Sequence, residues 1–423
     1  MSFRFQSGQA SPAAGPLHAA LLFGVPLFIL ALGHTLSSLL RTLPAVAVDV
    51  ISSDIAVSAA TLASLTGAYH LSFALGQIPA GIALDRYGVR AVALVLLTIS
   101  GIGAVLAATV GGAAGFLLAQ IVLGIGCCGM LLCPMTFAAK QLTPAQFGLW
   151  SALIQTVGNS GMLLSANPMA WLVETQGWRA GFWVSAGFAL VIGIAVMVVV
   201  PNLKPSRGAT KPLMDEARKV VSIGLSRQLR GVMIIAFAGF AALIAVRGLW
   251  GGPWLMDVKH LSRSDAASAL VPFTLALIFA PIVFGVLDRR FSCRRMMIFV
   301  CHLIGAVALF AVAVGGPGGV LSRLLGVSYL PAGFDIQAFL ALGIALSVIP
   351  LVFAMGREAV PPEHAGKALA AINLSVFAGA AVLQGITSPV ASYWGLPAVM
   401  IFLGGALMLA SCLFWWFTRS KRG

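Results

Sequence analysis

The feature that most restricts this chain is a series of twelve long apolar stretches separated by short polar loops. Each stretch is close to the ~20 residues that an α-helix needs to cross the ~30 Å hydrocarbon core of a bilayer. We therefore expect an all-α integral membrane protein with spans at residues 18–47, 59–84, 90–110, 114–138, 148–172, 180–200, 229–252, 265–287, 294–315, 336–357, 366–391 and 396–418.

The composition supports this interpretation. Charged residues make up 9% of the 423 residues and hydrophobic residues 60%, whereas a soluble protein carries about 25% charged residues. The net charge of +14 could suggest a nucleic-acid partner, but most of the 26 Lys and Arg residues fall on one side of the membrane if both termini are cytoplasmic. The positive-inside rule therefore predicts that topology and no nucleic-acid partner.

A long polar stretch divides the apolar spans into two sets of six. Residues 201–228 form this expected cytoplasmic linker, between an N-terminal bundle at 17–200 and a C-terminal bundle at 229–418. The tail at 1–16 is predicted to be disordered, and 419–423 is a basic C-terminal tail. A Gly- and Pro-rich loop at 316–335 falls on the outer side, and the sequence assigns it no role.

The two sets repeat one another weakly, as six-helix repeats in transporters do. Polar residues in the first and seventh spans and the loops after them correspond in order, and so do residues in the fifth and eleventh spans. The matched positions are Arg41, Asp49 and Ser58 with Arg247, Asp257 and Ser264, and Gly148, Gln155 and Gly161 with Gly366, Asn373 and Gly379.

The loop after the second span carries the most specific motif. It reads G-x-x-x-D-R-x-G-x-R, with Gly81, Asp85, Arg86, Gly88 and Arg90 in the fixed places. Gly81 permits close helix approach, and Gly88 permits a turn with positive φ.

This pattern resembles the signature loop between helices 2 and 3 of the major facilitator superfamily. The resemblance implies a secondary transporter with twelve transmembrane helices in two pseudo-symmetric six-helix bundles, placed in the cell inner membrane. A shorter copy occurs after the eighth span, with Asp288 and Arg289 as further residues of the conformational gate.

Two arginines lie within apolar spans, Arg41 in the first and Arg247 in the seventh. An Arg at a helix centre costs about 2.5–3.5 kcal/mol even on permissive insertion scales. Snorkelling, or pairing with backbone carbonyls or with Asp49 and Asp257, is one explanation. The other is anion binding, because the guanidinium fork matches carboxylate, phosphate and nitrate oxygens. The resemblance implies that helices one and seven face a central cavity, as in porters of organic anions and nitrate.

Neutral polar residues in the first, second, fifth and eleventh spans are the remaining candidates for the substrate site. His34 precedes Arg41 by two helical turns, and a histidine can exchange a proton near physiological pH. A structural role is the alternative for the two histidines, and an interhelical hydrogen bond is the alternative for Gln155, Asn159 and Asn373. The candidates beside the two arginines are His34, Tyr69, His70, Gln155, Asn159 and Asn373.

The sequence contains no phosphate-binding Walker loop, no metal-ligand helix motif and no nucleophile elbow. We therefore expect neither an enzyme nor a cofactor, and the expected partners are a small anionic solute, a coupling proton or counter-anion, and membrane lipid around a monomer. Two alternatives stay open: an antiporter for drugs or other hydrophobic compounds, and a non-transporting receptor or assembly protein with the same fold.

Overall fold

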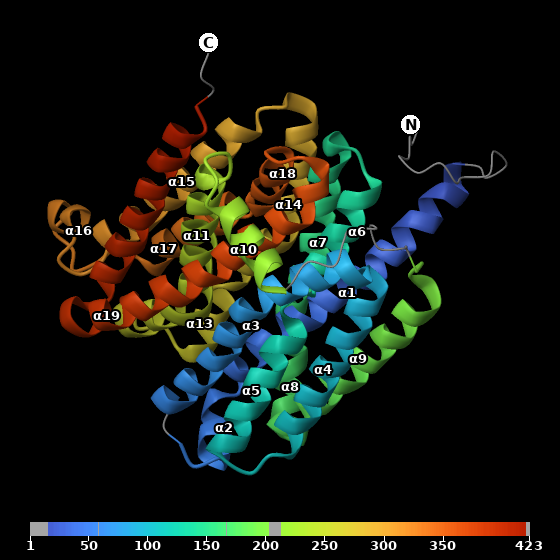
Figure 1. Cartoon of the computed structure of the whole chain (residues 1–423). Coiled ribbons are helices and arrows are strands. Elements are labelled where there is room, and N and C mark those ends of the chain that lie inside the picture. The colour runs from blue at the N-terminus through green and yellow to red at the C-terminus, as the bar shows by residue number, and fades with distance from the viewer. Residues whose placement is uncertain (1–15, 58, 166, 203–212, 420–423) are drawn as a thin grey trace. The chain divides into compact units, whose positions relative to one another are not determined.

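The computed structural model describes residues 16–57, 59–165, 167–202 and 213–419, and these are helical with no strand among them (Figure 1). Three parts of the chain lie outside the described residues: nearly all of the tail predicted to be disordered, part of the predicted linker, and residues 420–423 of the basic C-terminal tail. Helices satisfy every backbone donor and acceptor internally, which the bilayer requires of a lipid-exposed segment.

Every predicted span is helical over most of its described residues. Ten stretches are long and apolar enough to cross a membrane among the described residues. Of the remaining two predicted spans, the second corresponds to α3 (Ala59–Tyr87, 29 residues). The fifth corresponds to α7 (Pro144–Leu164, 21 residues) and the first part of α8 (Asn167–Gln176). The prediction of an all-α membrane protein is thus confirmed.

The chain divides into two compact units. Unit 1 comprises residues 1–223 and 360–374. Within it α1 packs on α7 and α9, α4 packs on α5 and α9, and α3 packs on α5. Its further helices are α1 (Pro16–Val46), α2 (Val48–Asp54), α4 (Val89–Thr109), α5 (Ala113–Cys127), α6 (Leu132–Gln141), α8 (Asn167–Gln176), α9 (Trp178–Val199) and α10 (Leu213–Gly224).

Unit 2 comprises residues 224–359 and 375–423, and α15 packs there on α17, and α14 on α17 and α18. The last helix, α19 (Ala365–Phe417), begins in unit 1 and bends at Gly395, whose φ of 78° interrupts the helical backbone between the eleventh and twelfth predicted spans. A 3-10 turn, η3 (Pro362–His364), precedes it. The other elements are α11 (Arg230–Ala245), η1 (Val246–Trp250), α12 (Gly251–Pro253), η2 (Trp254–Val258), α13 (Arg263–Ala269), α14 (Val271–Phe291), α15 (Arg294–Val314), α16 (Val320–Leu324), α17 (Ala332–Leu346) and α18 (Ile349–Glu358).

A buried ion pair ties the loop at 316–335 to the end of the seventh span. Lys259 Nζ lies 2.8 Å from Asp335 Oδ2, and both side chains are 0% exposed. The same ammonium donates to the Leu330 carbonyl at 2.7 Å and lies 5.0 Å from the centre of the Tyr329 ring. The structure buries the Lys259 side chain completely, and its bonds hold the 316–335 segment in place.

Breaking this pair should destabilise the protein strongly. Lys259→Met leaves the Asp335 carboxylate buried without its cation, which typically costs about 3–5 kcal/mol. The double variant Lys259→Met/Asp335→Leu removes both charges and should recover most of that loss. Thermal unfolding in detergent checks this, with the exposed Arg323→Ala in the same loop as the control. If the double variant is no more stable than Lys259→Met, the ion pair does not hold the 316–335 loop in place.

Candidate functional site

Helix α1 carries a polar stripe on one face. Residues three, four and seven positions apart share a helix face, and His34, Ser37, Ser38 and Arg41 follow that spacing. The first three side chains are buried and Arg41 is half-buried. One terminal nitrogen of the Arg41 guanidinium donates to Ser38 Oγ at 3.5 Å.

The His34 end of this stripe contacts α7. His34 Nε2 lies 3.3 Å from Gln155 Oε1, and the Thr35 hydroxyl donates to the Val157 carbonyl at 2.7 Å. Glycine is required where the helices touch, because a Cβ at Gly158 would lie 1.8 Å from the His34 ring and one at Gly161 would lie 2.1 Å from the Thr35 carbonyl. The structure therefore brings together two of the predicted site residues, His34 and Gln155.

The middle of the stripe contacts α3. The Tyr69 hydroxyl lies 3.4 Å from Ser37 Oγ, and the Tyr69 and His70 rings meet edge to face at 5.4 Å. Asn159 is half-buried on α7, one turn after Gln155. Five of the predicted site residues (His34, Arg41, Tyr69, His70 and Gln155) are thus linked directly or through α1 within unit 1.

In unit 2, Arg247 lies in η1, a π-helical turn. Its Nε donates to Thr274 Oγ1 on α14 at 2.7 Å. Three residues later, Trp250 Nε1 donates to Thr387 Oγ1 on α19 at 2.9 Å. Turns of this kind are rare and are frequently found at functional sites.

The signature loop follows a ladder of contacts between α3 and the beginning of α19. Asn373 Nδ2 donates to Gln77 Oε1 at 2.6 Å, and Gln77 Nε2 donates to the Cys128 carbonyl at 2.7 Å. One turn further, a Cβ at Gly81 would lie 2.7 Å from Ala370 Cβ. Gln77 and Gly81 are four residues apart, as is Asp85 after them, so all three face α19. Asn373 therefore belongs to this ladder, in contact with Gln77.

Asp85 ends the ladder at the N-terminus of α19. Its Oδ2 lies 3.8 Å from Lys367 Nζ, and its Oδ1 would lie 2.9 Å from a Cβ at Gly366. The first turn of a helix has backbone N–H groups without helical partners and carries partial positive charge, which favours a carboxylate. Gly366 therefore lets the carboxylate approach that turn.

The other loop residues have different surroundings. Gly88 has φ of 82°, as its turn requires. Arg90 donates to the Met197 carbonyl on α9, and the exposed Arg86 lies 5.4 Å from the centre of the Tyr87 ring. Asp85 is thus the charged residue of the motif with a contact to α19.

The second copy of the loop forms its own ion-pair network in unit 2. The buried Asp288 carboxylate accepts bonds from Arg294 Nε at 3.1 Å and from a terminal nitrogen at 2.6 Å. The other terminal nitrogen of Arg294 lies 2.7 Å from Glu358 Oε2 at the end of α18. Arg289 is exposed, so Arg294 rather than Arg289 is the partner of Asp288.

Sequence reasoning missed several of these partners. Gln77 could have been found from its spacing of four and eight residues to Gly81 and Asp85, because this spacing repeats on one helix face. Lys367, Glu358 and Thr274 gave no such signal, since their contacts join segments far apart in the chain.

Comparison with known proteins identifies the family. The family model described as Major Facilitator Superfamily matches residues 30–382. The chain therefore belongs to the major facilitator superfamily, a family of membrane transporters rather than enzymes, and the resemblance drawn from the signature loop is confirmed.

Relatives of known name are distant. The Methylenomycin A resistance protein of Bacillus subtilis (strain 168) is 23% identical, over 72% of this chain and 63% of its own length. A Probable nitrate/nitrite transporter, NarK2, of Mycobacterium tuberculosis is 26% identical, over 64% of this chain and 67% of its own length. The match to the first relative thus spans less than two thirds of it.

Solved structures share the fold. The proton:xylose symporter XylE has a TM-score of 0.73 at 17% identity, covering 95% of this chain and 96% of that one. The transporter FucP in its outward conformation has a TM-score of 0.74 at 13% identity, covering 94% of this chain and 100% of that one. At these identities the likeness concerns the fold alone.

The contact between α1 and α7 predicts a sharp difference between two glycines. Gly161→Ala places a methyl group against the Thr35 backbone carbonyl, so the helices must separate, at a cost of about 1–3 kcal/mol. Gly187→Ala on α9 is the matched control, since nothing lies within 4 Å of its Cβ position. The unfolding temperature should fall for Gly161→Ala and should stay level or rise for Gly187→Ala. Equal unfolding temperatures would contradict the close approach.

Proposed function

We propose that this protein is a secondary active transporter that moves a small anionic solute, such as a carboxylate, a phosphate ester or nitrate, across the inner membrane. Arg41 and Arg247 bind the anion. The observation that carries the proposal is the presence of one guanidinium at the matching place of the first and the seventh span, each half-buried on an apolar helix.

The surroundings of both arginines support this role. Both arginines donate to neutral hydroxyl oxygens, Arg41 to Ser38 Oγ and Arg247 to Thr274 Oγ1, and these bonds orient each guanidinium. A guanidinium forms strong charge-assisted bonds with an anion, and bidentate bonds to a planar oxyanion add geometric selectivity. The relationship to a probable nitrate/nitrite transporter agrees with this substrate class.

Neutral residues on α3 and α7, the helices that contact the polar stripe of α1, complete the proposed site. Gln155, Asn159, Tyr69 and His70 line the solute pathway next to Arg41. His34, two turns from Arg41, carries any coupling proton. The proposal places both termini in the cytoplasm and treats the protein as a monomer.

Movement follows alternating access, in which the access to the site opens on one side of the membrane at a time. The proposed cytoplasmic latch is the contact of Asp85 with the first turn of α19, and Asn373 with Gln77 extends it. A carboxylate at a helix N-terminus contributes about 0.3–1 kcal/mol at an exposed position and up to ~2 kcal/mol when partly buried, enough to bias two states without locking one.

Efflux of a hydrophobic compound is the second candidate, favoured by the relationship to the Methylenomycin A resistance protein. It predicts transport that is indifferent to both arginines. A non-transporting receptor with this fold would instead bind a ligand and show no flux in liposomes.

Replacing either arginine by lysine should weaken anion binding about tenfold, or about 1.4 kcal/mol, because the charge remains and the planar fork is lost. Thermal shift with a panel of small anions measures this, since a bound ligand raises the unfolding temperature. Arg218→Lys, at an exposed position on α10, is the control. Full stabilisation by anions in both Arg41→Lys and Arg247→Lys would contradict the proposed site.

Asp85→Asn should loosen the latch. Losing about 1 kcal/mol of charge–helix interaction changes the ratio of the two states about fivefold. Hydrogen exchange at residues 365–374 should accelerate and turnover should change, while equilibrium binding of solute stays near the parent value. Asp215→Asn, an exposed acidic residue on α10, is the control. Unchanged exchange together with unchanged turnover would refute the latch.

A further inference from the structure

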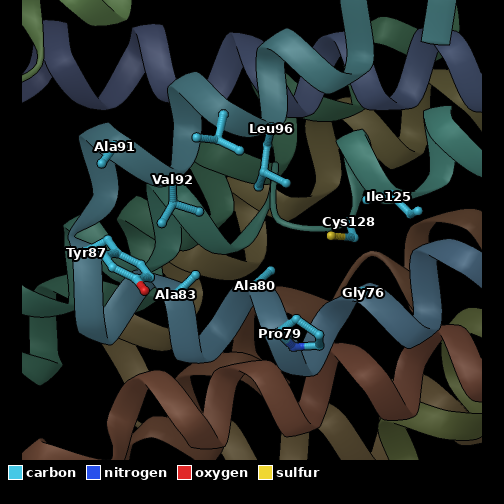
Figure 2. A pocket seen from close by; sticks show the side chains of 11 residues that line it. Gly76, Pro79, Ala80, Ala83, Tyr87, Ala91, Val92, Leu96, Ile125 and Cys128 are labelled. Carbon is cyan, nitrogen blue, oxygen red and sulfur yellow. The ribbon is translucent and has the colours of Figure 1, made fainter. Parts of the chain in front are cut away.

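An apolar groove runs along the surface of unit 1 between α3, α4 and α5 (Figure 2). Its volume is about 660 Å³, within the range of ~300–1,000 Å³ typical of ligand sites. Figure 2 shows Tyr87 and Ala91 at one end, Gly76 and Cys128 toward the other, and Val92 of α4 facing α3 between them.

The groove has a closed floor and an open rim. The floor is formed by the side chains of Ala80, Val92, Leu96 and Cys128, each at most 7% exposed. The floor is closed because α3 and α5 touch at Gly76, where a Cβ would lie 2.7 Å from Cys128 Sγ. The rim is formed by Tyr87, Val95 and Ile125, which are 56%, 58% and 42% exposed. Exposed apolar side chains on membrane-spanning helices face lipid, so the groove opens toward the acyl chains.

The length of the groove matches one leaflet. From Gly76 to Tyr87 the helix advances eleven residues, or about 16 Å at 1.5 Å per residue. Half of the ~30 Å hydrocarbon core is about 15 Å. Tyr87 is the last residue of α3, and tyrosine favours the interface between the hydrocarbon core and the headgroups.

Two basic residues adjoin that end. The exposed Arg86 guanidinium lies 5.4 Å from the centre of the Tyr87 ring. Arg90 directly precedes Ala91, which lines the groove, and donates to the Met197 carbonyl. The nearby acidic residue, Asp85, directs its carboxylate to Lys367 and α19. The groove therefore combines an apolar channel one leaflet long with positive charge at its mouth.

We propose that this groove binds one acyl chain of an anionic phospholipid, whose headgroup phosphate contacts Arg86. The chain fills the channel between α3, α4 and α5. Since α3 also carries Asp85, an occupied groove stiffens the helix that bears the proposed latch, and the lipid composition of the membrane sets how firmly α3 is held.

Photo-crosslinking tests the proposal. The protein is reconstituted in phosphatidylcholine nanodiscs with a trace of diazirine-tagged lipid, either phosphatidylglycerol or phosphatidylcholine. Adducts on peptides covering residues 76–96 should be about fivefold more abundant with phosphatidylglycerol, which corresponds to about 1 kcal/mol for one basic residue at the membrane surface. Arg86→Gln should abolish that preference, and Arg218→Gln should retain it.

Filling the groove tests the acyl-chain part separately. Ala83→Phe projects into the channel and Ala91→Phe covers it from the rim, and each should reduce adducts of both lipids. Ala186→Phe on α9, half-buried like Ala83, is the matched control. Three results would each overturn the proposal. The adducts could spread evenly over the lipid-facing helices, or the headgroup preference could survive Arg86→Gln. The third is that a hydrophobic drug displaces the tagged lipid and an excess of phosphatidylglycerol does not.

Discussion

The free-energy cost of placing polar groups in an apolar environment determines both the backbone structure of this protein and the pairing of its charges. Inside lipid every backbone group must find a partner within the chain, and this requirement explains the helical structure of all twelve predicted spans. The same cost applies to each charge that leaves water. The protein meets it by pairing Lys259 with Asp335, Arg294 with Asp288 and Glu358, and Asp85 with the first turn of α19.

These charged contacts divide by their degree of burial. The Lys259–Asp335 pair is wholly buried and ties a loop to the seventh span, so it acts as a fixed anchor. The Asp85 contact is longer, and its carboxylate side chain remains 31% exposed. A contact of this strength suits a step that must break and reform, whereas a buried pair would hold one state. Arg41 and Arg247 donate to neutral hydroxyls, and these bonds orient the two guanidinium groups.

The fold could be predicted from the sequence far better than the side-chain contacts could. Segment lengths and the signature loop were enough for the helical fold and the family, because apolar length and turn chemistry are local properties. Gly88 shows this, since its positive φ follows from the motif alone. Contacts between distant segments were not accessible, as Asn373 shows: no feature of the sequence indicated its bond to Gln77, 296 residues away. Similarly, nothing in the loop around Lys259 indicated that its charge would be buried against Asp335.

The most direct test of the central claim is solute counterflow in proteoliposomes loaded with nitrate, phosphate or a short carboxylate, each in turn. We predict that at least one loaded anion drives uptake of its own labelled form into vesicles with protein and not into empty vesicles. The account would be contradicted if no anion exchanged while the same vesicles moved a hydrophobic compound against its gradient.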